Sequence, residues 1–204
     1  MPEYSGTESL READGIASLV ERAAKGDRHA FNEIIGKFQE DIFRMVYFRT
    51  GSRMDAEDLT QEVFMKTYEG LASLKDSSLF RPWLYRVAVN RVHDYHRRKR
   101  VRSFFLFFGD REDVGDADDL RHPEPGALDL MVHNEFRKAM KAFLERLSSM
   151  ERDVFQLRFM EQLGIAEIGR VLDKNESTVK THLYRAVKKA QAEPRLLEII
   201  RGKP

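Results

Sequence analysis

The chain has 204 residues, of which 34% are charged and 42% hydrophobic, with a formal net charge of +1, so length and composition suit one or two small globular domains, with two favoured. The absence of cysteine excludes disulfides and cysteine-based zinc sites. The longest apolar run, Phe104 to Phe108, is too short to span a bilayer and the N-terminus is too polar for a signal peptide, so we expect a soluble cytoplasmic protein without membrane insertion.

The N-terminal part of the chain shows helical periodicity. Residues 1–14 are expected to be disordered, and a helix is predicted from about Ile16 to Lys25, ended by Gly26. Asp27 can cap the next helical pattern, which continues toward Gly51. Because strand alternation and hairpin turns are absent throughout, the fold class is predicted to be all-α.

Residues 53–71 are predicted to form an amphipathic helix. Its buried side comprises Ala56, Leu59, Val63, Tyr68 and Leu71. Its polar side carries Asp55, Asp58, Gln61 and Glu62. Acidic residues in the first turn also favour the helix dipole, so an ordinary surface helix explains the pattern. The sharper interpretation is a docking face for a basic partner.

A loop from Leu74 to Arg81 leads into a helix whose first residue is predicted to be Pro82. The inward face is expected to hold Leu84, Val87, Ala88 and Tyr95, and another face aligns Arg86, Asn90, His93 and Arg97. Four cations end the helix, Arg97 to Arg100, with Arg102 beyond. Dipole complementarity explains one or two of these cations. Cations beside the aromatic residues Phe80, Trp83 and Tyr85 suit single-stranded nucleic acid, where bases stack on rings.

Residues 102–127 are predicted to be an acidic, flexible linker. After the aromatic patch Phe104–Phe108, residues 109–126 hold seven carboxylates against two arginines. Such a composition cannot bury a core. The acidity either solvates a tether or imitates a nucleic acid in a basic channel.

The second domain is predicted over residues 128–193, followed by a tail over residues 194–204. Three of its helices are expected at about Ser148–Glu161, Ile165–Leu172 and Glu176–Gln191. Asp173 can adopt a left-handed turn and Asn175 can cap the last helix. Gly169 is unfavourable within a helix, and we attribute it to close approach of the following helix. The last two helices therefore form a predicted helix-turn-helix.

The last of these helices has two distinct faces. Val179, Leu183, Ala186 and Ala190 point to one side. The other side carries Ser177, Thr178, Thr181, Tyr184, Arg185 and Lys188, with Lys180 on the flank. Hydroxyls and long cations are what a major-groove helix needs to contact phosphates and base edges. The alternative is a solvated basic helix in a plain helical domain.

Three segments in this order resemble bacterial sigma factors of the extracytoplasmic-function (ECF) group. DAEDLTQEVFMKTY (55–68) is similar to the segment that docks on RNA polymerase, and FRPWLYRVAVNRVHDYHRR (80–98) to the helix that reads and melts the −10 element. LSSMERDVFQLRFME with STVKTHLYRAVKKA (177–190) is similar to the −35 reader. The resemblance covers about residues 16–192.

The resemblance implies a role for each segment. Core RNA polymerase, through the clamp helices of its largest subunit, would meet Asp55, Asp58, Gln61 and Glu62. The −10 element, as single-stranded promoter DNA with one base flipped into the loop, would meet Lys75, Asp76, Ser77, Phe80, Arg81, Trp83, Arg86, Asn90, His93 and Arg97. The −35 duplex would meet Ser177, Thr178, Lys180, Thr181, Tyr184, Arg185 and Lys188. An anti-sigma factor is a further expected partner.

Two other classes of function compete with this interpretation. A stand-alone helix-turn-helix regulator with an N-terminal dimerisation or ligand domain would bind duplex DNA only, as a dimer on a palindrome. An enzyme finds no support: His93 and His96 lack further ligands for a metal, and Ser77 and Ser78 lack a base. The sequence therefore predicts no catalytic residue, no metal site and no cofactor.

Overall fold

The computed structural model describes residues 6–107 and 138–193, and all regular structure within these two ranges is helical. The chain divides into two compact units, Met1–Asp118 and Asp119–Pro204. The fold class and the helix-turn-helix predicted from the sequence are confirmed. In the described ranges, no helix combines the length and the apolarity that crossing a membrane requires.

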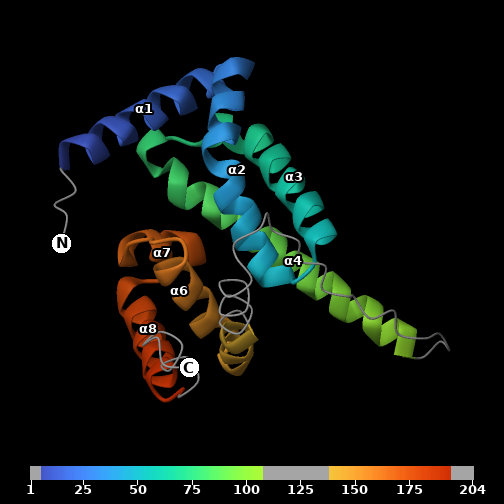
Figure 1. Cartoon of the computed structure of the whole chain (residues 1–204). Helices are drawn as coiled ribbons and strands as arrows, with labels where there is room; N and C mark the ends of the chain where they lie inside the picture. Colours follow the sequence, from blue (N-terminus) through green and yellow to red (C-terminus); the bar gives the residue numbers. More distant parts are fainter. Residues whose placement is uncertain (1–5, 108–137, 194–204) are drawn as a thin grey trace, which may run out of the picture. The chain divides into compact units, whose positions relative to one another are not determined.

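Within residues 6–107, the N-terminal unit has four long helices (Figure 1). They are α1 (Gly6–Ala24), α2 (Arg28–Thr50), α3 (Arg53–Gly70) and α4 (Phe80–Phe107), with the short 3-10 helices η1 (Leu71–Ser73) and η2 (Ser77–Leu79) before α4. Gly26 has a φ of 95°, and Asp27 accepts hydrogen bonds from the amides of His29 and Ala30, as the sequence predicts for this turn. Gly51, with a φ of 70°, ends α2, and Ser52 caps α3.

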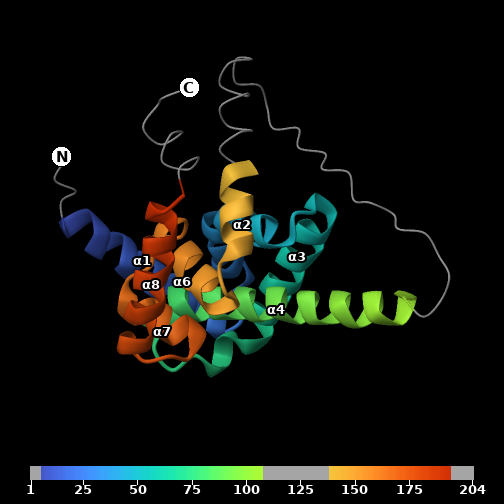
Figure 2. The ribbon, with the colours of Figure 1, turned by 90° about the horizontal axis from the view of Figure 1, so that it is seen from below.

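Helix α2 packs against α1, α3 and α4. Its fully buried side chains include Ile34, Ile42 and Met45. The Phe38 ring lies edge-on to Phe80 at the start of α4, with centroids 5.5 Å apart. The C-terminal part of α4 extends beyond the other helices of this unit (Figure 2). Only the first part of α4 therefore belongs to the packed body.

Several predicted boundaries in this unit are wrong. Residues 6–14 are helical rather than disordered, because SLREAD continues the helix-forming sequence of α1 toward the N-terminus. Helix α4 begins at Phe80, two residues before Pro82. Pro82 is tolerated at this position because the first turn of a helix needs no backbone N–H donor. It also continues to Phe107, so residues 102–107 belong to α4 and not to the linker.

The buried side of α3 also differs from the prediction. Tyr68 is 45% exposed, whereas Phe64 and Thr67 are buried. The Thr67 hydroxyl donates to the carbonyl of Val63 at 2.8 Å, which satisfies this polar group inside the helix. Tyr68 lies at the edge of the buried side, where its ring meets that of Phe31.

Within residues 138–193, the C-terminal unit has helical residues 138–146, followed by α6 (Ser149–Phe159), α7 (Ile165–Leu172) and α8 (Glu176–Gln191). Its core cluster contains Phe143, Leu144, Leu147, Phe155 and Ala186. The rings of Phe143 and Phe155 meet edge-on at 5.1 Å. The predictions for residues 1–5, 108–137 and 194–204 lie outside the described residues.

Candidate nucleic-acid interface

The turn before α8 has the geometry of a helix-turn-helix. Asp173 adopts the left-handed conformation, with φ 55° and ψ 50°, and ends α7. The side chain of Asn175 accepts a hydrogen bond from the amide of Thr178 at 2.8 Å and caps α8. A Cβ on Gly169 would lie 2.7 Å from the carbonyl oxygen of Lys174. The close approach predicted at Gly169 is therefore made by the turn itself and not by the following helix.

Helix α8 separates its apolar and polar residues as its sequence predicts. Val179 and Ala186 are buried, and Leu183 and Ala190 are half-buried. The exposed residues are Ser177, Lys180, Thr181, Tyr184, Arg185 and Lys188, while Thr178 is half-buried. The Tyr184 side chain is 69% exposed. This unit therefore presents one continuous polar and cationic face.

Two contacts on this face are internal to α8. Lys180 lies 3.4 Å from Glu176, one turn earlier, and the Thr181 hydroxyl donates to the carbonyl of Ser177 at 2.9 Å. Both groups are exposed, so a ligand competes with weak local interactions only. A phosphate or base edge could therefore take over these donors at little cost.

Glu151 ties α8 to α6. Its carboxylate accepts from the amide of Ser148 at 2.9 Å, which completes a capping box, and lies 2.6 Å from the ammonium of Lys189. The hydrogen bond from Lys189 lowers the pKa of Glu151, and the Ser148 backbone amide acts in the same direction, against the effect of burial. This buried carboxylate therefore fixes the C-terminal half of α8 through Lys189, one turn after Arg185.

On α4, the four polar residues predicted to share a face are all exposed: Arg86, Asn90, His93 and Arg97. They recur at helical spacing and form what we call the α4 stripe. Arg97 is also within 3.0 Å of Asp94, a neighbour on the same helix. The stripe is exposed, with part of its charge already balanced.

The aromatic residues beside the stripe are placed differently from the prediction. Phe80 is fully buried and Tyr85 is 1% exposed, so neither ring can stack on a base in this conformation. Both face inward because α4 starts before Pro82 and packs its first turns against α2. Trp83 is half-buried, and the edge of its indole lies where a Cβ on Gly70 would be 3.0 Å away. Trp83 is thus the remaining partly accessible ring of the three.

The loop before α4 is organised by Asp76. Its carboxylate accepts from the amide of Ser78 at 3.0 Å and from the hydroxyl of Ser78 at 2.6 Å. The Ser77 hydroxyl donates to Glu21 of α1 at 3.1 Å, a contact that the sequence pattern did not predict. Lys75 is exposed, and Arg81 lies over the Tyr85 ring, 5.7 Å from its centroid. The loop residues named from the sequence therefore lie close together, with α1 as an additional support.

The acidic side of α3 is only partly free. Asp58 and Gln61 are exposed, and Glu62 lies 3.9 Å from Arg98 of α4. Asp55 instead accepts a hydrogen bond from the hydroxyl of Tyr95 at 2.7 Å. Sequence reasoning also missed Met54 and Met65, which are 70% and 63% exposed and follow the same side of α3 at helical spacing. The signal was available, since both interrupt a polar surface.

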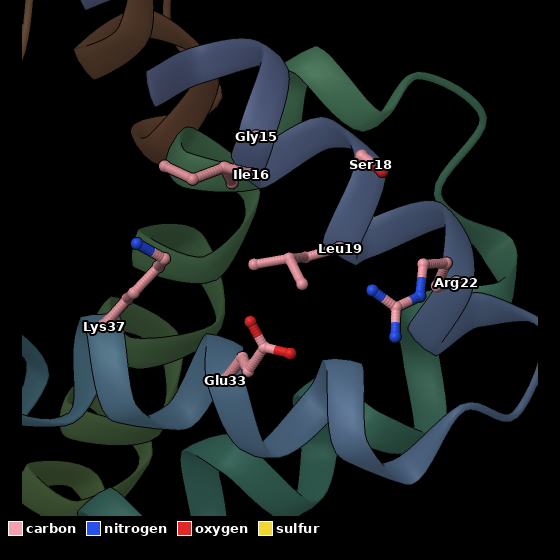
Figure 3. A pocket seen from close by; sticks show the side chains of 7 residues that line it. All are labelled: Gly15, Ile16, Ser18, Leu19, Arg22, Glu33 and Lys37. Carbon is pink, nitrogen blue, oxygen red and sulfur yellow. The ribbon is translucent and has the colours of Figure 1, made fainter. Parts of the chain in front are cut away.

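A hollow of about 410 Å³ lies between α1 and α2 (Figure 3). The side chains of Arg22, Glu33 and Lys37 lie at its edge beside Leu19. All three charged residues are exposed, and Arg22 is paired with Asp27 at 2.6 Å. Because the hollow has no buried polar group to orient a ligand, we assign it none.

Comparison with known proteins covers both units. The family model described as Sigma-70 region 2 matches residues 34–102, and the model described as Sigma-70, region 4 matches residues 137–189. The α4 stripe falls within the first match and most of α8 within the second. Helix α1 lies outside both.

Individual similar proteins and solved structures are also sigma factors. The chain is 32% identical over 175 residues to the ECF RNA polymerase sigma-E factor of Escherichia coli (strain K12), covering 82% of this chain and 88% of the relative. It is 32% identical over 174 residues to the ECF RNA polymerase sigma factor BldN of Streptomyces coelicolor, of which it spans 63%. A solved structure of the sigma factor RpoE with the anti-sigma factor NepR from Bartonella quintana matches 84% of this chain and 96% of the solved one, at 20% identity and a TM-score of 0.62.

Proposed function

The chain belongs to the ECF RNA polymerase sigma factors of the sigma-70 family, and from this premise we propose that it binds core RNA polymerase and directs transcription initiation at promoters whose −10 and −35 elements it contacts. The observation that carries the proposal is the presence of two exposed cationic helix faces, one in each unit, in the order of the two matched regions. The sigma factor family is not a class of enzymes. A stand-alone helix-turn-helix regulator is not favoured, because it leaves the α4 stripe unexplained.

Polymerase docking is assigned to the exposed side of α3. Asp58, Gln61 and Glu62 supply acceptors for a basic partner, and Met54 and Met65 add apolar area on the same side. Exposed methionine is suited to adaptable packing at an interface. We expect the clamp helices of the largest polymerase subunit to meet this surface.

The −10 element is assigned to the α4 stripe and the loop before it. Arg86, His93 and Arg97 can follow the phosphates of a single strand, and the amide of Asn90 can pair with a base edge. The loop at Lys75, Asp76 and Ser77, with Arg81 and Trp83 at its end, would receive a flipped base, whose unstacked edge can be hydrogen-bonded. Phe80 supports this loop from the core.

The −35 element is assigned to the exposed face of α8. Lys180 and Arg185 are the proposed base contacts, because long cations reach guanine O6 and N7 in the major groove. Ser177, Thr178, Thr181, Tyr184 and Lys188 are proposed to contact phosphates or thymine methyl groups. This division assigns sequence preference to two residues and orientation to the others.

An anti-sigma factor is proposed as a second protein partner. The related fold solved with NepR is a sigma factor held by an anti-sigma factor. The exposed methionines of α3 offer apolar area that such a partner could cover in the absence of polymerase. Competition between the partner and core polymerase for α3 is the expected means of control.

The test is association with core RNA polymerase followed by transcription from a promoter library. Stable association and initiation from a narrow promoter class are expected. Asp58→Lys is expected to weaken core binding roughly tenfold or more, because a reversed charge at a docking site loses attraction and adds repulsion. Glu40→Lys, the same reversal at an exposed position of α2, is the matched control and should change it less than about twofold. A folded protein that binds an operator tightly but never binds polymerase would overturn the proposal.

A further inference from the structure

Among the residues predicted to dock on polymerase, Asp55 has a carboxylate that accepts a hydrogen bond from another helix of the N-terminal unit. It lies in the first turn of α3, and its Oδ2 accepts a hydrogen bond from the Tyr95 hydroxyl of α4 at 2.7 Å. Both residues are half-buried. The contact joins positions 40 residues apart, so it links two helices rather than neighbouring turns.

The same hydroxyl also holds a cation. The ammonium of Lys99 donates to the Tyr95 oxygen at 3.2 Å and lies 5.6 Å from the centre of the Tyr95 ring. Tyr95 thus donates to Asp55 and accepts from Lys99. Burial raises the pKa of Tyr95, and the hydrogen bond to Asp55 raises it further, so the hydroxyl keeps its proton at neutral pH.

Two further contacts hold this part of α4 against neighbouring helices. The Nε2 of His96 lies 3.0 Å from the carbonyl oxygen of Arg49 near the end of α2. Arg98 lies 3.9 Å from Glu62 of α3. Residues 95–99 are therefore fixed from two sides at the point where α4 leaves the packed body. Beyond this point, the exposed Arg100 lies on the extending part of the helix.

We propose that Asp55 is a positioning residue for the proposed −10 helix and does not contact polymerase. Through Tyr95 it sets the rotation and direction of α4 where His93 and Arg97 of the stripe are exposed, while Lys99 holds the Tyr95 hydroxyl from within α4. A charge-assisted hydrogen bond of this length is directional, so it constrains rotation about the helix axis more than apolar packing does. The expected effect on DNA binding rests on the proposed function, whereas the expected effect on amide exchange in α4 does not.

Three substitutions separate positioning from docking. Tyr95→Phe removes the donor and leaves α3 untouched. Asp55→Ala removes the acceptor and the charge, and Asp55→Asn keeps an acceptor for Tyr95 but loses the charge. Asp41→Ala removes an exposed carboxylate of α2 that accepts from Arg44 and is the control. The full chain is used throughout, with circular dichroism to verify folding.

Two measurements are made on each variant. Amide hydrogen exchange of residues 93–101 in the free protein is expected to rise roughly threefold to tenfold in Tyr95→Phe and Asp55→Ala, the range for loss of one half-buried hydrogen bond. Binding of the holoenzyme to a single-stranded −10 oligonucleotide, with the sequence selected from the promoter library, should weaken by a similar factor. Combining the two substitutions should add little, because they remove the same contact. Asp55→Asn should recover most of both effects.

Affinity for core polymerase should stay within about twofold in all four variants. If Asp55→Ala and Asp55→Asn weaken core binding alike while Tyr95→Phe does not, Asp55 is a docking residue and the inference is wrong. Unchanged exchange of residues 93–101 in Tyr95→Phe also overturns it, whatever polymerase does. Failure of the wild-type chain to bind polymerase contradicts the proposed function instead, and the exchange result still decides the inference.

Discussion

Helix α8 is positioned by one apolar face and by the Glu151–Lys189 contact to α6, whereas α4 is positioned by contacts with α2, α3 and η2. On α8, Val179 and Ala186 are buried, and the opposite face carries the proposed −35 contacts. On α4, the stripe depends on Phe80 in the core, on Tyr95 and Asp55, and on His96 beside α2. The proposed duplex-binding surface can be drawn on one helix, but the proposed single-strand surface is assembled from distant segments.

The largest expected effect is a loss of stability on truncating Phe80, the buried ring through which α4 is held in the N-terminal core. Phe80→Ala should destabilise the N-terminal unit by about 3–5 kcal/mol, since it removes a fully buried ring from contact with Phe38. Urea unfolding followed by fluorescence of Trp83, the single tryptophan, gives the free energy directly. Tyr184→Ala, which truncates an exposed ring on α8, should change stability by less than about 0.5 kcal/mol, measured by circular dichroism.

Phe80→Leu separates support from stacking. Leucine preserves most of the buried volume, so the loss should stay below about 1.5 kcal/mol, and binding of the −10 strand should be retained. If the Phe80→Leu variant keeps its stability but loses as much affinity for the −10 strand as the loss of a base-stacking ring would cost, then Phe80 contacts DNA and does not only support the loop.

The next effect concerns the turn that presents α8. Gly169→Ala should destabilise the C-terminal unit by about 1–3 kcal/mol, because the new Cβ would meet the backbone oxygen of Lys174 at 2.7 Å and the turn would have to move. Gly36→Ala in α2 is the matched control. A Cβ there meets nothing within 4 Å, so the same substitution should stabilise by about 0.5–1 kcal/mol through helix propensity. Amide exchange within α7 and α8 measures the stability change in Gly169→Ala, and exchange within α2 measures that in Gly36→Ala. Stabilisation in both variants would contradict the proposed role of the turn.

This contrast also explains what could be predicted from the sequence. The bounds of α7 and α8, the left-handed Asp173 and the Asn175 cap follow from local residue chemistry, and the structure has them as predicted. Local rules are sufficient there because the helix-turn-helix is built from contiguous residues. The all-α fold class could be predicted because helical periodicity is likewise a local property of the sequence.

Around α4 the same rules were insufficient. Whether Phe80 and Tyr85 face DNA or the core depends on where α4 begins and on the position of α2, which is not a local property. The partners Asp55–Tyr95 and Glu21–Ser77 are 40 and 56 residues apart, so no spacing pattern could indicate them. A carboxylate with a distant internal partner looks identical in sequence to one that is free to dock.

A smaller effect is expected at Arg185, where the proposed α8 face can be divided into base and phosphate contacts. Arg185→Ala should cost about 1–2 kcal/mol at one −35 position and little on promoters already altered there. Competition binding of holoenzyme to a set of single-base −35 variants measures this. An equal loss on every sequence, with a smaller salt dependence, would make Arg185 a phosphate contact.

The smallest expected effect concerns the pH dependence of the anchor between α6 and α8. Glu151→Gln should cost about 0.5–1 kcal/mol at neutral pH, because Lys189 keeps a hydrogen-bond acceptor but loses its ion pair. The pKa of Glu151 is lowered in the folded state, so its contribution is complete above the ordinary value of 4.5 and is lost as pH falls through the lowered value. The difference between wild type and variant should therefore shrink as pH drops below about 4.5.

Amide exchange within α6 and α8, corrected for the intrinsic pH dependence of exchange, measures this difference across the acid range. Glu176→Gln is the control, because the Glu176–Lys180 pair is exposed and lies within one helix. Its effect should stay within a few tenths of a kcal/mol at every pH. A difference for Glu151→Gln that persists unchanged below pH 4 would mean that packing, and not the charge of Glu151, holds α8 against α6, and the apolar face of α8 would then be sufficient to orient it.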